Sequence, residues 1–100
     1  MITISERIAE HIEFLEQGEY PLNMKLERII QHEYRRKLVR YQHADRLFRK
    51  KYQMDFETFR RANMVAQFNY SFEVETDASD WELAIDGIMT MTRKIQELTE

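Results

Sequence analysis

Apolar residues recur along most of the chain at steps of three and four residues, a spacing that places side chains on one side of an α-helix. The first run is Ile4, Ile8, Ile12 and Leu15. It predicts a helix that starts at Thr3 or Ser5. The helix should end before Gly18, because glycine readily adopts the left-handed conformation that follows many helices.

The second run is the longest in the chain. It consists of Leu26, Ile30, Tyr34, Leu38, Tyr41, Ala44 or Asp45, Phe48 and Tyr52. With Asn23 as its cap, this run predicts a central helix that continues to about Tyr52 and is roughly 42 Å long at 1.5 Å per residue. A rod of that length cannot bury its own apolar side, so another helix, from this chain or a second copy, must cover it.

Asp55 is well placed to cap a third helix, with Glu57 in its first turn and Phe56 and Phe59 facing inward. We expect this helix to end between Gln67 and Asn69. Residues 70–75 then alternate between apolar and polar side chains, the period of a strand. Because no second convincing strand is present, the alternation favours an extended connector; the alternative is a lone strand that pairs with its symmetry mate in a dimer.

The last helix has the clearest pattern. Ser79 and Glu82 match a capping box, in which serine caps the helix and glutamate follows three residues later. An apolar stripe then repeats in the heptad spacing, at Trp81, Ala84, Ile88, Met91, Ile95 and Leu98. Gly87 lies in the middle of this predicted helix, where glycine is unfavourable, and a close approach of another helix would compensate.

Composition points to the same architecture. The chain has 100 residues but only two glycines and one proline, too few for the frequent turns of an all-β fold. We therefore predict a single all-α domain over residues 1–100, with a long central helix, an antiparallel C-terminal helix and shorter flanking helices. The absence of cysteine excludes disulfides. No apolar run is long enough for a membrane span and no signal peptide is recognisable, so a cytoplasmic protein is expected.

The charged residues are segregated along the chain. Residues 1–23 hold five acids and one arginine, a net charge of −4, whereas residues 24–61 hold twelve cations and five acids, a net charge of +7. Residues 62–100 hold eight acids and two cations, a net charge of −6. Such runs commonly cover solvated helix faces and pair with one another in the fold, and they can also form a surface for a charged partner.

Candidate chemistry is sparse. His32 and His43 are eleven residues apart, roughly 16 Å along a helix, too far to hold one ion, and His11 lies elsewhere in the chain. No cysteine nucleophile, phosphate-binding glycine loop or paired metal-ligand motif is present. The sequence therefore predicts no catalytic, metal or cofactor site, and a non-enzymatic protein.

Two segments stand out as a pair, KKYQMDFETF at residues 50–59 and YSFEVETDASDWELAIDGI at residues 70–88. With these segments, the chain resembles small prokaryotic proteins that are similar to the antitoxin members of toxin–antitoxin pairs, and the similarity covers roughly residues 34–98. The resemblance implies a small helical protein that neutralises a partner such as a nuclease. Neither of the DNA-binding modules that many antitoxins carry, ribbon-helix-helix or helix-turn-helix, is clear in this chain.

Two functional hypotheses follow. The first is an antitoxin-like interaction protein, most simply a homodimer, that binds a protein partner. Its predicted partner-binding residues are Trp81, Ile88, Met91, Glu73, Glu75 and Asp80. The alternative is a nucleic-acid-binding or regulatory protein that uses the basic central helix. Its predicted contacts are Arg35, Arg36, Arg40, Arg46 and Arg49.

Overall fold

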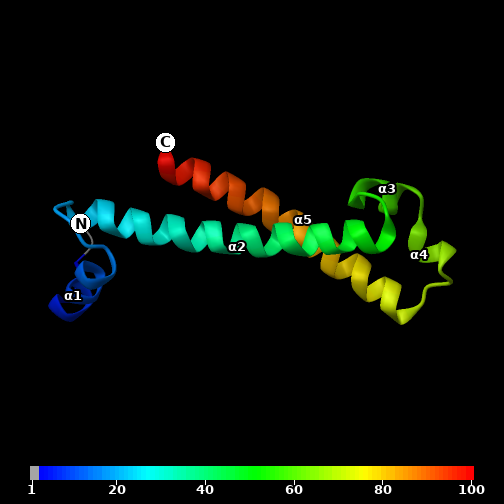
Figure 1. Cartoon of the computed structure of the whole chain (residues 1–100), viewed down its shortest axis with the longest axis horizontal. Coiled ribbons are helices and arrows are strands. Elements are labelled where there is room, and N and C mark those ends of the chain that lie inside the picture. The colour runs from blue at the N-terminus through cyan, green and yellow to red at the C-terminus, as the bar shows by residue number, and fades with distance from the viewer. Residues whose placement is uncertain (1–2) are drawn as a thin grey trace.

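A computed structural model describes residues 3–100, and within them every regular element is a helix (Figure 1). The helices are α1 (Glu6–Leu15), α2 (Leu22–Tyr52), α3 (Phe56–Arg61), α4 (Met64–Gln67) and α5 (Phe72–Thr99). The central helix α2 follows the long axis of the molecule, and α5 returns antiparallel to it and crosses it obliquely (Figure 1). The predicted all-α architecture with a long central helix is confirmed.

Local sequence explains where α1 and α2 begin. The Ser5 hydroxyl accepts a hydrogen bond from the backbone N–H of Ile8 at 3.2 Å, so the prediction that α1 starts at Ser5 is confirmed. The prediction that Asn23 caps α2 is wrong, because α2 already begins at Leu22 after Pro21. The fixed φ of proline suits a helix entry, and the Pro21 carbonyl accepts the N–H groups of the first turn. The predicted end of α2 at Tyr52 is confirmed.

The third predicted helix is only partly correct. Asp55 caps α3, and its carboxylate accepts the backbone N–H of Thr58 at 2.8 Å. However, α3 ends at Arg61 rather than continuing to residues 67–69. Asn63 adopts a left-handed conformation with φ 51°, which asparagine tolerates better than most residues, and the short helix α4 follows it.

The predicted extended connector over residues 70–75 is wrong. Ser71 caps α5, its hydroxyl accepting the backbone N–H of Val74 at 3.3 Å, so Ser79 lies inside the helix rather than at its start. The alternating pattern misled because Val74 is buried in the core while Tyr70 and Phe72 are exposed. Both Ser71 and Ser79 are acceptable helix caps, and the burial of Val74 in the core favours the start at Ser71.

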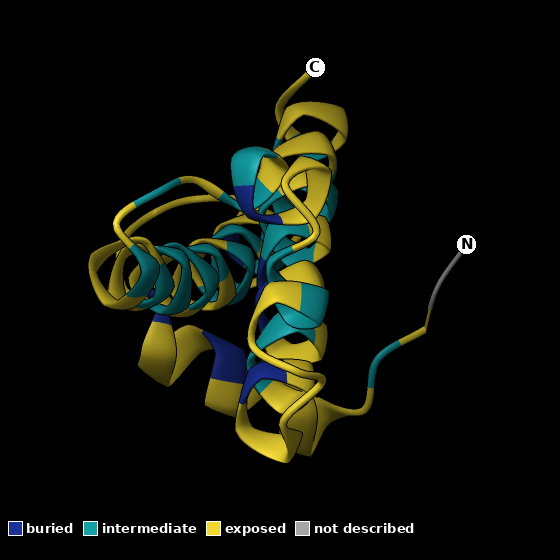
Figure 2. Ribbon diagram, turned by 90° about the vertical axis from the view of Figure 1, so that its right-hand side faces the viewer, coloured by how far each residue is buried: buried dark blue, intermediate teal, exposed yellow. Residues whose placement is uncertain are grey.

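The helices α2 and α5 approach each other closely at Gly87. A Cβ atom built on Gly87 would lie 2.5–2.7 Å from ring atoms of Tyr41, so only glycine allows this approach. The close helix–helix contact predicted at Gly87 is confirmed. Among residues 3–100, few apolar side chains are buried (Figure 2). They are Ile12, Phe59, Val74, Trp81 and Ala84.

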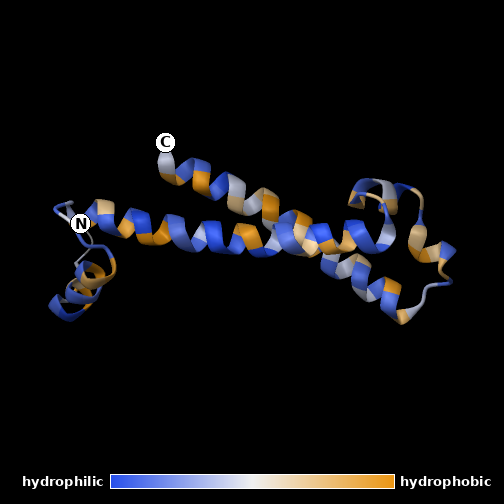
Figure 3. Cartoon of the chain, in the orientation of Figure 1, coloured by the Kyte–Doolittle hydropathy of each residue, from blue (hydrophilic) through white to orange (hydrophobic). Residues whose placement is uncertain are grey.

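The helix α1 lies at the opposite end of α2 from α3 and α4 (Figure 1). Hydrophobic segments also remain along the N-terminal half of α2, beyond the part that α5 crosses (Figure 3). The molecule measures 58 × 25 × 24 Å. It is therefore a rod with one packed end, and most of its helical surface stays accessible.

Candidate protein-binding groove

The packed end of the rod is organised by an aromatic cluster around Trp81, which no solvent reaches. Phe48 and Tyr52 of α2 stack on the indole, with ring centroids 5.5 and 5.9 Å from it. Phe56 and Phe59 of α3 tilt against the same indole at 5.3 and 5.1 Å. These contacts hold α3 beside α5 and thereby fix the space between the two helices.

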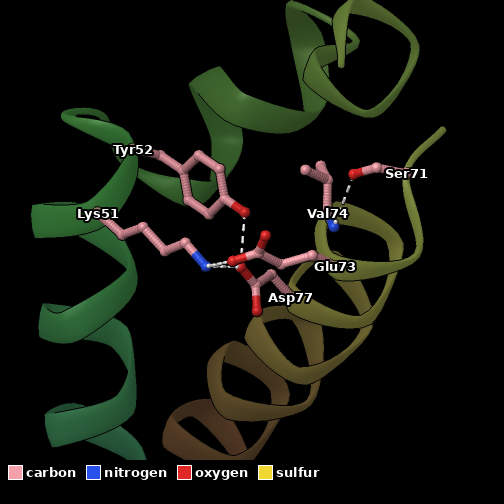
Figure 4. Close-up of polar contacts among 6 residues, drawn as sticks. All are labelled: Lys51, Tyr52, Ser71, Glu73, Val74 and Asp77. Atoms are coloured by element: carbon pink, nitrogen blue, oxygen red, sulfur yellow. Dashed lines mark hydrogen bonds and ion pairs between the residues drawn. The ribbon is translucent and has the colours of Figure 1, made fainter. Parts of the chain in front are cut away.

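Polar groups tie α2 to α5 next to this cluster (Figure 4). One carboxylate oxygen of Asp77 accepts hydrogen bonds from the Tyr52 hydroxyl and the Lys51 ammonium, both at 2.6 Å. Lys51 also donates to Glu73 at 2.7 Å. Burial pushes the pKa of Asp77 upward, but the hydrogen bonds from Lys51 and Tyr52 outweigh it and hold this pKa below its usual value. Burial and the bond to Asp77 raise the pKa of Tyr52 to about 12.

A groove runs along the boundary between α3 and α5. It consists of two adjoining clefts of about 310 and 380 Å³, both lined by Phe56, Arg60 and Glu82. Apolar side chains line both clefts, and the exposed Met89 is one of those that line the second. The remaining apolar lining residues are Phe59, Met64, Val65, Ala78 and Ile85. We call this feature the α3–α5 groove.

The second cleft of the α3–α5 groove has an acidic rim. Its lining includes four acids, Asp55, Glu57, Glu82 and Asp86, and two cations, Arg49 and Arg60. Arg49 is already neutralised by Asp45, Nε to Oδ2, at 3.1 Å. Asp55 is engaged as the α3 cap, and hydrogen bonds from Thr58 lower its pKa. Within residues 3–100, neither the other three acids nor Arg60 makes an ion pair, so the unpaired acids of this cleft outnumber its unpaired cation.

The predicted partner-binding residues are not brought together at this groove. Trp81 is in the core, and Ile88 and Met91 are half-buried on the side of α5 that carries Trp81 and faces α2. Glu73 is paired with Lys51 at 2.7 Å. Of the predicted partner-binding residues, only Glu75 and Asp80 are exposed carboxylates outside any ion pair of the described residues, and neither lines the groove.

The predicted nucleic-acid contacts divide in a similar way. Arg36 pairs with Glu33, and Arg49 with Asp45, within the same helix. Arg35, Arg40 and Arg46 are exposed and make no ion pair in the part of the chain that the structure describes. Arg35 and Arg46 share one side of α2, because eleven residues make close to three turns, and Arg40 lies on another side.

The sequence interpretation missed the groove because it depends on the break at Asn63, which ends α3 early and leaves the edge of α5 open. A signal was nevertheless present. Ile85 and Met89 follow Trp81 at steps of four, which forms a second apolar stripe beside the one that faces α2. A second stripe on a helix indicates a second contact surface.

Other classes of site find little support in the described part of the chain. Between residues 3 and 100, no three histidine or acidic side chains gather as a metal ion would require. Nor does any of the five described helices combine the length and apolar character needed to cross a bilayer. When the chain is compared with protein-family models, curated proteins and solved structures, nothing matches.

Proposed function

We propose that the chain is a non-enzymatic interaction protein that binds a basic, amphipathic segment of another protein in the α3–α5 groove. The observation that carries the proposal is the combination of an apolar lining with an acidic rim whose Glu57, Glu82 and Asp86 are unpaired among the described residues. Both features belong to the two adjoining clefts on the packed end of the rod, which share Phe56, Arg60 and Glu82.

The chemistry of the groove defines the partner. Apolar side chains of an incoming helix would occupy the lining, in the way amphipathic helices enter hydrophobic grooves of other proteins. Lysine or arginine next to those side chains would face Glu82 and Asp86. Complementary charge of this kind speeds association and excludes acidic competitors. That the partner is a toxin, neutralised by this chain, is a finer proposal supported by the sequence resemblance of residues 50–59 and 70–88.

A peptide-display selection on the full chain tests the groove. We expect enrichment of peptides in which lysine or arginine flanks large apolar residues, and loss of their binding in the double variant Glu82→Lys/Asp86→Lys. The matched control is Glu75→Lys/Asp80→Lys, which makes the same charge change at exposed positions outside the groove. Enrichment of acidic peptides, or equal loss in both double variants, would contradict the proposal.

A second function is favoured by Arg35 and Arg46. They are exposed, make no ion pair within residues 3–100, and lie roughly 16 Å apart on one side of a straight helix, a spacing that reaches separate phosphates of a nucleic acid. If α2 binds nucleic acid, a gel shift seen at low salt should disappear in Arg35→Glu/Arg46→Glu. Arg36→Glu/Arg49→Glu is the control, because those two arginines are already paired.

A further inference from the structure

The side of α2 that faces away from α5 is lined by basic residues over most of the length of the helix. Tyr41 and Asp45 lie on the side that contacts α5. The side roughly opposite follows from a turn of about 100° per residue. The residues of α2 on that side are Lys25, Arg28, His32, Arg35, Arg36, Val39, His43, Arg46 and Lys50. We call these residues the outer stripe of α2.

The outer stripe contains no acid, although the structure describes the whole of α2. The acids of this helix lie on its other sides, and they are Glu27, Glu33 and Asp45. Lys25 and Lys50 are roughly 38 Å apart at 1.5 Å per residue. Positive charge therefore repeats over a distance that a single acidic side chain or a small acidic patch cannot match.

The C-terminal two thirds of the outer stripe, from Arg35 to Lys50, are open to solvent. Arg35, Arg46 and Lys50 are exposed and make no ion pair within residues 3–100. Arg36 is also exposed but is engaged by Glu33 of the same helix. Three cations are thus available to an anionic partner without any change in the fold.

The start of the outer stripe is instead occupied by carboxylates of α1. Glu13 pairs with the ammonium of Lys25. Glu16 accepts from Nε of Arg28 at 2.9 Å and lies 3.4 Å from Nδ1 of His32. Each of the first three residues of the stripe therefore meets an acid of α1, at the place where an anionic partner would set its own charge.

Little else holds α1 in this position. Among the described helices α1 packs against α2 alone, and Ile12 is its only buried apolar residue. The side chains of Glu13, Arg28 and His32 are 54%, 50% and 63% exposed, so water can solvate each of them separately. The core around Trp81 lies at the other end of α2 (Figure 1), so α1 can leave without disturbing it.

We propose that α1 is a displaceable cover over a site for double-stranded nucleic acid that extends along the outer stripe of α2. Phosphates of the duplex replace the carboxylates of Glu13 and Glu16 at Lys25 and Arg28, and the same duplex meets the open cations beyond them. This inference rests on the second proposed function, nucleic-acid binding by α2, and it does not depend on the α3–α5 groove.

The composition of the outer stripe selects a duplex as the partner. An amphipathic helix of another protein needs apolar side chains to pack against, and Val39 is the only one that the stripe offers. Single strands bind largely through bases stacked on aromatic rings, and the stripe has no aromatic ring other than imidazole. A duplex needs neither, because it carries one charge per about 1.7 Å and is bound through its phosphates.

The affinity of the full chain for a double-stranded DNA of mixed sequence tests the cover. We expect Glu13→Gln/Glu16→Gln to bind at least about tenfold more tightly than the wild type, because binding to the wild type must displace α1. The matched control is Glu6→Gln/Glu10→Gln, which removes the same charge from exposed positions of α1 that make no ion pair in the described part of the chain. At about 0.1 M salt, screening should keep the control within about twofold of the wild type.

Amide hydrogen exchange on the wild-type chain tests the displacement directly. A saturating amount of the duplex should speed exchange across α1 by about tenfold or more, whereas α5 should keep its protection. Poly-glutamate, at the same concentration of charge, is the comparison ligand. Release of α1 by poly-glutamate but not by the duplex would overturn the assignment and indicate an acidic protein as the partner.

Salt dependence tests whether the duplex reaches the start of the outer stripe. When Lys25→Gln/Arg28→Gln is added to Glu13→Gln/Glu16→Gln, the slope of log affinity against log salt should fall by about two, one for each lost phosphate contact. An unchanged slope would contradict the extended site.

The outcomes separate failure of the cover from failure of nucleic-acid binding. If neither the wild type nor Glu13→Gln/Glu16→Gln binds the duplex, the second proposed function is wrong and the cover with it. If both bind it with equal affinity, or α1 stays protected in the complex, α2 binds nucleic acid but α1 does not cover the site.

Discussion

The indole N–H of Trp81 donates a hydrogen bond to Oδ1 of Asp45 at 2.9 Å, across the interface between α5 and α2. Trp81 is completely buried, and among the described residues this carboxylate oxygen is the only hydrogen-bond acceptor for its indole N–H. The other oxygen of Asp45 accepts from Arg49 at 3.1 Å. One acid on α2 therefore fixes the orientation of the ring around which the aromatic cluster is built.

Replacement of Asp45 should separate the loss of a charge from the loss of an acceptor. Asp45→Ala leaves the buried indole N–H unpaired and should cost about 1–3 kcal/mol of unfolding free energy. Asp45→Asn keeps a carbonyl oxygen for the indole and should cost less. Urea unfolding, followed by the fluorescence of this single tryptophan, measures both. Equal losses would show that the charge of Asp45, not its acceptor, stabilises the fold.

Gly87 should not tolerate a methyl group, although alanine is the better helix former by about 1 kcal/mol. The added Cβ would lie 2.5–2.7 Å from the Tyr41 ring, including its Cγ, so the ring cannot simply rotate away. We expect Gly87→Ala to lower the unfolding free energy by about 1–3 kcal/mol. The loss should shrink in a Tyr41→Ala background, where space exists, and thermal unfolding of the four chains measures this coupling.

The extent of α2 was predictable because its apolar steps are unbroken for seven turns and no glycine or proline interrupts them. The start of α5 was not predictable from local pattern. Ser71 and Ser79 are both acceptable caps, and what selects Ser71 is the burial of Val74 beside Phe59 and the bond between Asp77 and Tyr52. Those contacts join residues fifteen and twenty-five positions apart, which a local pattern does not report.

The α3–α5 groove was less accessible still to sequence reasoning. It forms because the chain turns at Asn63 and Phe56 packs on Trp81, which leaves Arg60 and Glu82 facing one hollow. Trp81 was predicted to bind a partner because it is large and lies in the apolar stripe of α5. Large aromatic residues in such a stripe are commonly part of the core, as Trp81 is.

Tyr52 should ionise late in an alkaline titration. Its folded pKa is raised to about 12 by burial and the hydrogen bond to Asp77, against about 10 in an unfolded chain. The stability contributed by the protonated phenol is therefore complete below about pH 10 and is lost as pH rises toward 12. Absorbance near 295 nm should show a late step that Tyr52→Phe removes.

The raised pKa of Tyr52 also predicts how its contribution to the free energy of unfolding depends on pH. The difference in unfolding free energy between wild type and Tyr52→Phe should be constant below about pH 10 and should decline above it. A difference that does not change between pH 9 and 12 would show that Tyr52 titrates alike in the folded and unfolded chains. Circular dichroism during urea unfolding at each pH provides the measurement.

One ion pair joins α1 to α2, and loss of its acid should weaken the attachment of α1 more than loss of its cation. Lys25 is only 3% exposed and its ammonium pairs with Glu13, which is 54% exposed. Beside this pair, Arg28 and His32 bind the Glu16 carboxylate at 2.9 and 3.4 Å. Removing the acid leaves a buried cation without its partner, whereas removing the cation leaves an acid that water can solvate.

Glu13→Ala should therefore release α1, and Lys25→Met should not, since methionine keeps the buried aliphatic stem. A fully buried pair costs about 3–5 kcal/mol when one partner is removed, and the exposure of Glu13 reduces the expected loss to about 2 kcal/mol. Amide hydrogen exchange should show roughly thirtyfold faster exchange across α1 in Glu13→Ala, with α5 unchanged. Equal protection of α1 in the two variants would mean that Ile12 and Glu16, rather than the buried ammonium, hold the helix in place.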